Sequence, residues 1–287
     1  MQQSLTSKQV ARALEVSESS IKRWCDKGVL PATYTAGGHR RIPMSGLINF
    51  LRTSNHDLAR PEVLGLPATS GQGVRVLDRA ASQMSQALLE GDEESCRRIA
   101  VDLYLAEHSL SNICTGVFAK AFDEIGQKWE CGEAEVYQER RGCTIIGRVL
   151  SELRSFLPAP SSDAPVAIGG APSGDPYNLG TTMVELVLRE PGWNAVSLGY
   201  NLPFETLSAA IKKNRPSLFW MSVSHMDDKR AFLDGYAELY DTFGLDVAFV
   251  VGGRALTAEV RNEMKYAAFC DNFEHLEAFA RTLYAGE

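Results

Sequence analysis

The spacing of apolar residues divides the chain into three parts with different patterns. Residues 4–53 hold short amphipathic stretches, and residues 74–157 repeat apolar positions at helical spacing without a proline. From residue 166 onward, short apolar runs alternate with amphipathic stretches. This order predicts a small N-terminal domain, a four-helix bundle and a C-terminal α/β domain. Residues 56–73 and 158–164 are rich in Pro, Gly and Ser, and we expect them to be linkers.

Two short helices are expected at the start of the N-terminal part. Thr6 and Gln9 have the spacing of a capping box, which predicts a helix beginning directly after Thr6. Ser17 is placed to cap a second helix over residues 18–27, and Gly28 fits the left-handed position that follows a helix. Two helices joined by a tight turn are a unit with which proteins read DNA.

A hairpin with basic residues follows the second helix. The pair Gly37-Gly38 permits a tight turn, and guanidinium groups on the strand that returns from it are suited to DNA phosphates. On the second helix, serines and basic residues lie off the apolar face, where they can reach base edges in the major groove. We therefore predict the following DNA contacts: Ser19, Ser20, Lys22, Arg23, His39, Arg40 and Arg41.

Four motifs follow one another within these fifty residues: Lys8-Gln9-Val10-Ala11, Ile21-Lys22-Arg23-Trp24, Gly28-Val29-Leu30-Pro31 and Gly37-Gly38-His39-Arg40-Arg41-Ile42. Their order resembles the MerR-like and excisionase-like winged helix family. The resemblance implies a winged helix-turn-helix domain over residues 1–55 that binds a double-stranded DNA operator. The alternative is a basic helix pair used for protein contacts, but caps, charge and hairpin agree with the DNA-binding interpretation.

The distribution of charge supports this division. The chain of 287 residues has a net charge of -7, but residues 1–60 have a net charge of +5 and the rest a net charge of -12. A basic head on an acidic body is typical of a nucleic-acid-binding module joined to a domain of another kind. No apolar run approaches the ~20 residues of a membrane helix, and the N-terminus has no secretory pattern. We expect a cytoplasmic protein without a membrane partner.

The six cysteines are scattered and form no C-x-x-C pair, which argues against a zinc ribbon or a disulfide framework. In the helical part, Trp129 is followed after nine residues by Glu139 and Arg140. A tryptophan in a bundle is normally a core residue. This stretch, however, resembles the helical cap of light-responsive MerR-type regulators, which carries Trp, nine residues and Glu-His. The resemblance implies that Trp129, Glu139 and Arg140 lie over the upper face of a corrin, with Arg140 in place of the His.

The C-terminal part reads as a doubly wound, flavodoxin-like domain over residues 165–287. Five apolar runs predict buried parallel strands at residues 166–168, 195–198, 218–222, 247–251 and 267–270. The amphipathic stretches between them predict helices on both faces of the sheet, with ligands binding at the carboxyl ends of the strands.

The loops at those ends carry Asp-x-Tyr-x-x-Gly, Ser-x-Ser and Gly-Gly motifs. This arrangement looks like a cobalamin-binding domain, in which Asp-x-His-x-x-Gly, Ser-x-Leu and Gly-Gly surround the cofactor. The resemblance implies that these residues contact it: Asp175, Tyr177, Gly180, Ser222, Ser224, Gly252 and Gly253. The family's cobalt ligand is a His that Asp orients, and here that position is Tyr177. A phenol, with a reference pKa of about 10, is protonated at neutral pH and ligates cobalt poorly. Asp175 can instead accept a hydrogen bond from the Tyr177 hydroxyl.

Three ligand states remain open: cobalamin without a protein ligand, a linear tetrapyrrole, or none. We expect a transcriptional regulator whose sensor domain, responsive to an effector or to light, controls assembly into a dimer or tetramer and operator binding. The alternative is a ligand-independent regulator controlled by a protein partner such as an antirepressor. An enzyme or a methyl-carrying corrinoid protein is disfavoured because the His that tunes cobalt is missing. No catalytic residues and no metal site are predicted.

Overall fold

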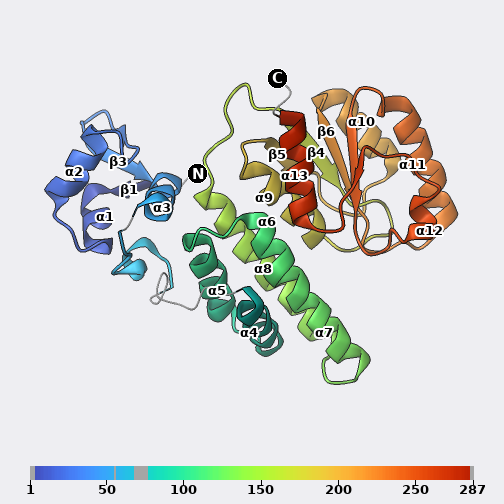
Figure 1. Cartoon of the computed structure of the whole chain (residues 1–287), viewed down its shortest axis with the longest axis horizontal. Helices are drawn as coiled ribbons and strands as arrows, with labels where there is room; N and C mark the ends of the chain where they lie inside the picture. Colours follow the sequence, from blue (N-terminus) through green and yellow to red (C-terminus); the bar gives the residue numbers. More distant parts are fainter. Residues whose placement is uncertain (1–3, 55, 68–76, 285–287) are drawn as a thin grey trace. The chain divides into compact units, whose positions relative to one another are not determined.

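The computed structural model describes residues 4–54, 56–67 and 77–284. Residues 68–73 of the first expected linker lie outside the described residues. The chain forms two compact units, Met1–Pro158 and Ala159–Glu287, coloured from blue to green and from yellow to red in Figure 1.

The first unit begins with a winged helix-turn-helix. Its elements are β1 (Ser4–Thr6), α1 (Ser7–Ala13), α2 (Glu18–Asp26), β2 (Thr33–Tyr34), β3 (Arg40–Pro43) and α3 (Met44–Thr53), with antiparallel sheet order β1-β3-β2. The predicted capping box is confirmed, because Gln9 N–H donates to Thr6 Oγ1 at 3.2 Å and Thr6 N–H donates to Gln9 Oε1 at 2.9 Å. Ser17 caps α2, and Gly28 is left-handed with φ +71°. Local sequence signals therefore place both helices.

Part of the segment that we expected to be a linker is folded onto this domain. A short 3-10 helix, η1 (Pro61–Leu64), packs against α1, and the Arg60 N–H donates to the Ala13 carbonyl at 2.8 Å. Leu64 and Leu66 are buried. The winged-helix domain therefore includes apolar residues beyond residue 55, and the Pro and Gly of this stretch shape a packed turn.

The rest of the first unit is a helical bundle. Its elements are α4 (Leu77–Glu90), α5 (Glu93–Leu105), α6 (Leu110–Ile113), the π-helical η2 (Cys114–Ala119), α7 (Lys120–Glu130) and α8 (Val136–Phe156). Because α6, η2 and α7 follow one another without a break, the described residues form four helical segments. This agrees with the predicted four-helix bundle.

Arg97 on α5 connects two helices and the folded segment before them. Its guanidinium donates to both carboxylate oxygens of Glu152 on α8, at 2.5 and 2.6 Å, and to the Gly65 carbonyl. Both side chains are largely buried, at 26% and 22% exposed. This ion pair therefore ties α5, α8 and the segment after η1 together.

Replacing Glu152 by alanine should lower the free energy of unfolding by about 1.5–3 kcal/mol, because Arg97 loses a charged hydrogen-bond partner while it stays mostly buried. Urea unfolding of the full chain, followed by circular dichroism, measures the effect. Glu94→Ala is the matched control, since Glu94 is 66% exposed and 3.7 Å from Arg97; it should change stability by less than about 0.5 kcal/mol. Equal losses in the two variants would contradict the role given to Glu152.

The second unit is a five-stranded parallel sheet between two layers of helices. Its strands are β4 (Val166–Gly170), β5 (Asn194–Ser197), β6 (Leu218–Ser222), β7 (Ala248–Gly252) and β8 (Ala268–Phe269), in the order β5-β4-β6-β7-β8. Its helices are α9 (Leu179–Arg189), α10 (Phe204–Asn214), α11 (Lys229–Phe243), α12 (Ala258–Arg261) and α13 (Phe273–Tyr284). The predicted doubly wound, flavodoxin-like topology is confirmed.

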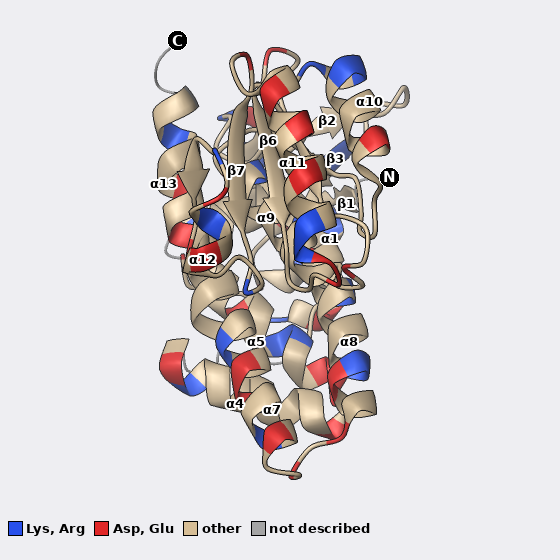
Figure 2. Ribbon diagram, turned by 90° about the vertical axis from the view of Figure 1, so that its right-hand side faces the viewer, with Lys and Arg blue, Asp and Glu red and all other residues tan. Residues whose placement is uncertain are grey.

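The two faces of this sheet are covered by different helices. α10 and α11 pack against an aromatic core that includes Phe219, Phe232 and Phe249, whereas α9 and α13 contact each other on the opposite face. The outer side of α11 carries acidic residues (Figure 2). No helix of the described residues is long and apolar enough to cross a membrane.

Candidate effector cavity and DNA-contacting surface

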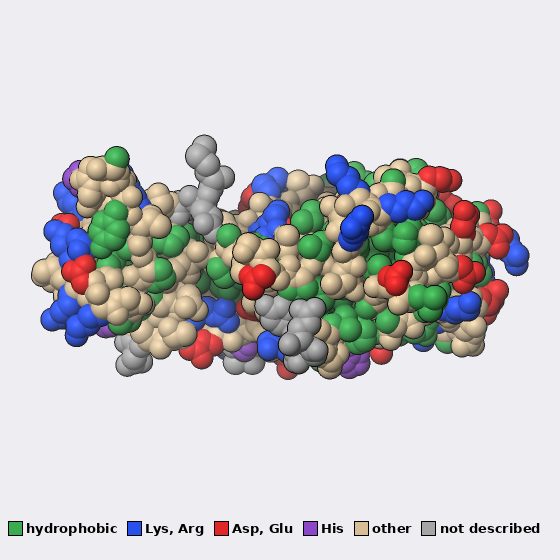
Figure 3. Space-filling model, turned by 90° about the horizontal axis from the view of Figure 1, so that it is seen from above, with side chains coloured by type: hydrophobic (Ala, Val, Ile, Leu, Met, Phe, Trp, Pro, Cys, Tyr) green, Lys and Arg blue, Asp and Glu red, His purple; other side chains and the backbone are tan. Residues whose placement is uncertain are grey.

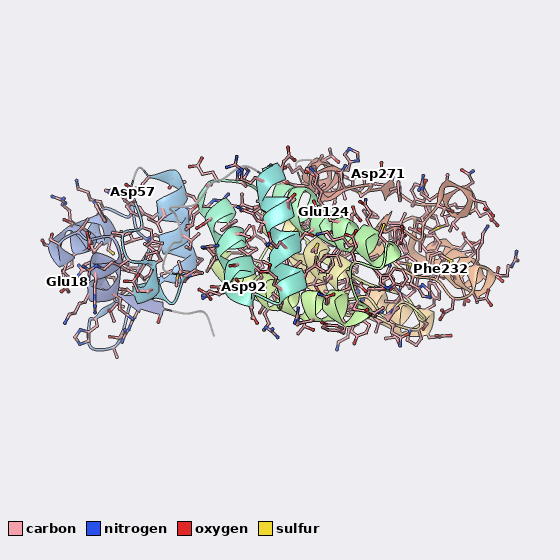
Figure 4. The ribbon with its side chains drawn as sticks, turned by 90° about the horizontal axis from the view of Figure 1, so that it is seen from below. Glu18, Asp57, Asp92, Glu124, Phe232 and Asp271 are labelled. Atoms are coloured by element: carbon pink, nitrogen blue, oxygen red, sulfur yellow. The ribbon has the colours of Figure 1, made fainter. Side chains whose placement is uncertain are left out.

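A cavity of about 180 Å³ lies at the carboxyl ends of β6 and β7, on the side covered by α9 and α13. Five residues predicted from the loop motifs line it: Gly180, Ser222, Ser224, Gly252 and Gly253. The remaining lining residues were not predicted from the sequence: Val184, Trp220, Met221, Val250, Val251, Cys270, Asp271, Asn272, Phe273 and Leu276. The loop motifs therefore converge on one cavity, and the segment around Asp271, labelled in Figure 4, supplies part of its wall.

Two of the lining glycines sit where a side chain has no room. A Cβ atom on Gly180 would lie 2.5 Å from Ser222 Oγ, and one on Gly253, with φ +112°, would overlap the Val223 carbonyl. At Gly253 glycine is required for close approach of the backbone and for its conformation, whereas at Gly180 an added side chain would displace the Ser222 hydroxyl. The glycines keep the cavity open beside the strands.

Asp175 is fully buried and holds two loops together. One carboxylate oxygen accepts the Tyr177 N–H at 3.0 Å, and the other accepts the N–H groups of Ser224 and His225 at 2.6 and 3.2 Å. All three donors are backbone amides, whereas the sequence suggested a hydrogen bond from the Tyr177 hydroxyl. Asp175 thus joins the loop after β4 to the loop after β6, one of which carries Ser224 into the cavity wall.

Tyr177 packs against a cation. The guanidinium of Arg254 lies 5.2 Å from the centre of the Tyr177 ring, and its Nε donates to the Ser224 carbonyl at 3.2 Å. His225, which follows Ser224, pairs through Nε2 with Asp227 Oδ1 at 2.8 Å. The loops after β4, β6 and β7 are thereby linked through side chains near Tyr177.

Trp220 forms an apolar wall of the cavity. Its side chain is almost fully buried, and its indole N–H donates to Thr181 Oγ1 at 2.8 Å. Gly169 lies directly opposite it in the β4–β6 register, where a Cβ atom would overlap the Trp220 carbonyl and ring. The sequence placed Trp220 on a buried strand, but only the packing of α9 against the sheet shows that it borders the cavity.

The cap-motif residues belong to the other compact unit, where they lie at the α7–α8 connection. Trp129, at the end of α7, is 54% exposed, and Arg140 is also exposed while Glu139 is half-buried. Val136 and Tyr137 beside them are exposed as well. Trp129 is therefore not a core residue of the bundle.

A basic cleft of about 440 Å³ lies between α1, α2 and the hairpin of the winged-helix domain. Lys22, His39, Arg40 and Arg41 line it together with Lys8, which the sequence analysis did not predict as a DNA contact. Lys and Arg side chains gather on the surface of this domain in Figure 3. The cleft therefore brings most of the predicted basic DNA contacts together at one place, where they are suited to phosphates.

The predicted DNA contacts on α2 differ in how available they are. Ser19 and Ser20 hydroxyls lie 2.7 and 2.9 Å from Ser17 Oγ, so both take part in the cap of α2. Lys22 Nζ is 3.2 Å from Glu18, which starts α2 and is labelled in Figure 4. Arg23 is exposed.

Cys270 provides a chemical probe of the cavity. Burial, followed by the negative charge of Asp271, raises the pKa of its thiol to about 11. Because only about a thousandth of such a thiol is ionised at pH 8, Cys270 should react with iodoacetamide far more slowly than the exposed Cys131. Its rate should rise about tenfold per pH unit until the pKa is reached. Mass spectrometry of the alkylated peptides measures both rates, and equal rates at pH 8 would contradict the raised pKa of Cys270.

Comparisons with known proteins agree with this organisation. A helix-turn-helix domain matches residues 4–54, and a B12 binding domain matches residues 80–154. The methanol–corrinoid protein of Methanosarcina barkeri (strain Fusaro) is 25% identical over 113 residues, which are 39% of this chain and 43% of that protein. The match thus spans less than half of the length of this curated relative.

Among solved structures, the Methanosarcina barkeri monomethylamine corrinoid protein matches with a TM-score of 0.61 and 17% identity, covering 72% of this chain and all of that one. A cobalamin-binding protein from Desulfitobacterium hafniense DCB-2 matches with a TM-score of 0.39 and 16% identity, over 73% and 99% of the two chains. The first comparison confirms the predicted order of helical region and parallel sheet as a corrinoid-protein fold. The chain therefore combines a helix-turn-helix domain with a B12 binding domain.

Proposed function

We propose that this protein is a MerR-type transcriptional regulator whose C-terminal domain binds cobalamin or a linear tetrapyrrole and thereby controls assembly and operator binding. One observation carries the proposal: five residues predicted from separate loop motifs line one cavity, in a chain that also has a helix-turn-helix domain. A light response is part of the proposal when the effector is adenosylcobalamin.

The cavity suits one part of a cobalamin, but its residues do not supply all of the contacts that cobalamin usually makes. Its glycine-bordered shape suits a slender group such as a nucleotide tail, and its lining is mostly apolar. Tyr177, packed against Arg254, does not supply the imidazole that would ligate cobalt. Within the described residues, no group of three or more His, Cys, Asp or Glu side chains could hold a metal ion. We therefore assign binding of an effector, and no step at cobalt, to these residues.

DNA binding follows from the basic cleft and from linkage between protomers. Cations of the cleft such as Lys8 and Arg41 would neutralise phosphates on either side of a groove. When protomers assemble into a dimer or tetramer, their DNA-binding domains share a high effective concentration, which raises operator affinity without a new contact. An effector that binds one assembly state better shifts the population towards it.

An absorption spectrum tests the effector. The full chain is incubated in the dark with adenosylcobalamin, or separately with biliverdin, and then desalted. Retained chromophore bands support the proposal, and Gly180→Val should abolish them because its side chain enters the cavity. Gly126→Ala is the matched control, since nothing lies within 4 Å of a Cβ there. Retention of neither ligand by the unaltered chain would overturn the effector assignment.

A ligand-independent regulator is the second candidate. The contacts among Tyr177, Arg254 and Ser224 favour it, because they fill space near the position of the family's cobalt ligand. In that case a protein partner, such as an antirepressor, controls DNA binding. In both candidates the role is binding and not catalysis.

A further inference from the structure

The two neighbouring arginines of the wing strand lie on opposite faces of its sheet. β3 is the central strand, and successive side chains on a strand point to opposite sides. Ile42, which is fully buried and pairs with the buried Leu5, marks the side that faces the domain core. Arg40 shares that side with Ile42. Arg41 lies on the other side, in register with Thr6 and Thr33.

Arg40 forms an ion pair with α2, which is the recognition helix expected to enter the major groove. Its Nη2 lies 2.5 Å from Oδ1 of Asp26, the last residue of α2, and its guanidinium lies 5.5 Å from the centre of the Tyr34 ring on β2. Only 23% of its side chain is exposed, and its Nε is buried without a hydrogen-bond partner. The contact with Asp26 is the main cause of the raised pKa of Arg40. One side chain thus joins α2, β2 and β3.

Arg41 and Lys8 differ from Arg40 in this respect. All three line the basic cleft, but neither Arg41 nor Lys8 forms an ion pair with any residue that the structure describes. Their charges are therefore available for phosphates, whereas the charge of Arg40 is already compensated. To reach a phosphate, Arg40 would have to leave Asp26 and expose that carboxylate beside the DNA.

We propose that Arg40 is a positioning residue, which fixes the wing against the recognition helix, while Arg41 neutralises a DNA phosphate. This inference rests on the proposed DNA-binding function. Each phosphate neutralised by the protein contributes about 0.9 to the slope of log K against log salt concentration. A positioning residue and a phosphate-binding residue therefore differ in the slope, even where both variants bind DNA more weakly.

The test measures binding of the full chain to a labelled random-sequence duplex over a series of KCl concentrations. Arg41→Ala should reduce the slope by about 0.9. Arg40→Ala should weaken binding about tenfold with the slope unchanged, because it alters the position of the wing and not the number of counterions released. The double variant Arg40→Asp with Asp26→Arg exchanges the two charges and keeps the ion pair. It should therefore regain most of the DNA affinity that Arg40→Ala loses. A fall of about 0.9 in the slope of Arg40→Ala would overturn the assignment.

Hydrogen exchange without DNA gives a second readout. The amides of residues 33–43 should exchange faster in Arg40→Ala and at the unaltered rate in Arg41→Ala. Unchanged exchange in Arg40→Ala would also overturn the inference. If Arg40→Ala does not fold, Arg40→Gln, which also removes the charge, replaces it, with the same two expectations. Absence of salt-dependent binding by the unaltered chain would refute the proposed function, while hydrogen exchange would still decide whether Arg40 positions the wing.

Discussion

Replacing Asp175 by alanine is expected to lower the free energy of unfolding by about 3 kcal/mol and to abolish retention of the proposed effector. The carboxylate is fully buried and accepts three backbone N–H groups, from Tyr177, Ser224 and His225. Alanine leaves these donors without their acceptor, and each buried unsatisfied group costs about 1–3 kcal/mol. Because the loops can relax and expose these donors to water, the total loss of stability should lie near the lower end of the sum of the three costs.

Loss of effector follows because Ser224, whose amide is held by Asp175, lines the cavity. Urea unfolding and the absorption measurement report the two effects separately. Asp227→Ala is the matched control: this carboxylate lies in the loop after β6, close in sequence to Ser224 and His225. It is 71% exposed, and its removal should change stability by less than about 0.5 kcal/mol. If Asp175→Ala is no more destabilising than Asp227→Ala, the two loops are not held together by Asp175.

Signals confined to a few neighbouring residues predicted the structure well. The cap residues Thr6 and Ser17 and the left-handed Gly28 are found where the sequence placed them, because each acts through hydrogen bonds or backbone conformation within one turn. The buried strands also occur within a few residues of their predicted ranges. A strand that is buried on both faces requires a continuous apolar run, which is visible in a single sequence.

Features set by long-range packing were missed. Cys270, Asp271 and Phe273 border the cavity because the order of the sheet brings β8 and α13 beside β7. The local sequence around these three residues does not predict that they border a cavity. Similarly, Pro61 and Gly65 are typical of a linker, but burial of neighbouring leucines against α1 decides the structure of that stretch.

The adjacent arginines of the wing show how a composition-based assignment can merge two roles. In sequence, Arg40 and Arg41 are equivalent cations after a glycine turn. On the strand they point to opposite faces, and only one of them meets Asp26. The partner lies fourteen residues away on α2, so the distinction depends on tertiary structure.

Replacing Gly169 by alanine should be the most destabilising single-methyl change at the sheet centre, with a loss of about 3 kcal/mol or more. The added Cβ would overlap both the carbonyl oxygen and the indole ring of Trp220, its register partner on β6. The indole is held by Thr181 and nearly fully buried, so it has little space to withdraw. Moving the carbonyl would disturb β4–β6 pairing, which lies between the outer strands of the sheet.

Thermal unfolding by circular dichroism measures this effect, and Gly147→Ala is its matched control. Gly147 lies within α8 with nothing within 4 Å of an added Cβ, so alanine there should stabilise the helix by up to about 1 kcal/mol. Adding Trp220→Phe to Gly169→Ala should restore little, because the overlap with the backbone carbonyl remains. Full recovery in that double variant would show that the indole alone, and not the closeness of the two strands, requires glycine at this position.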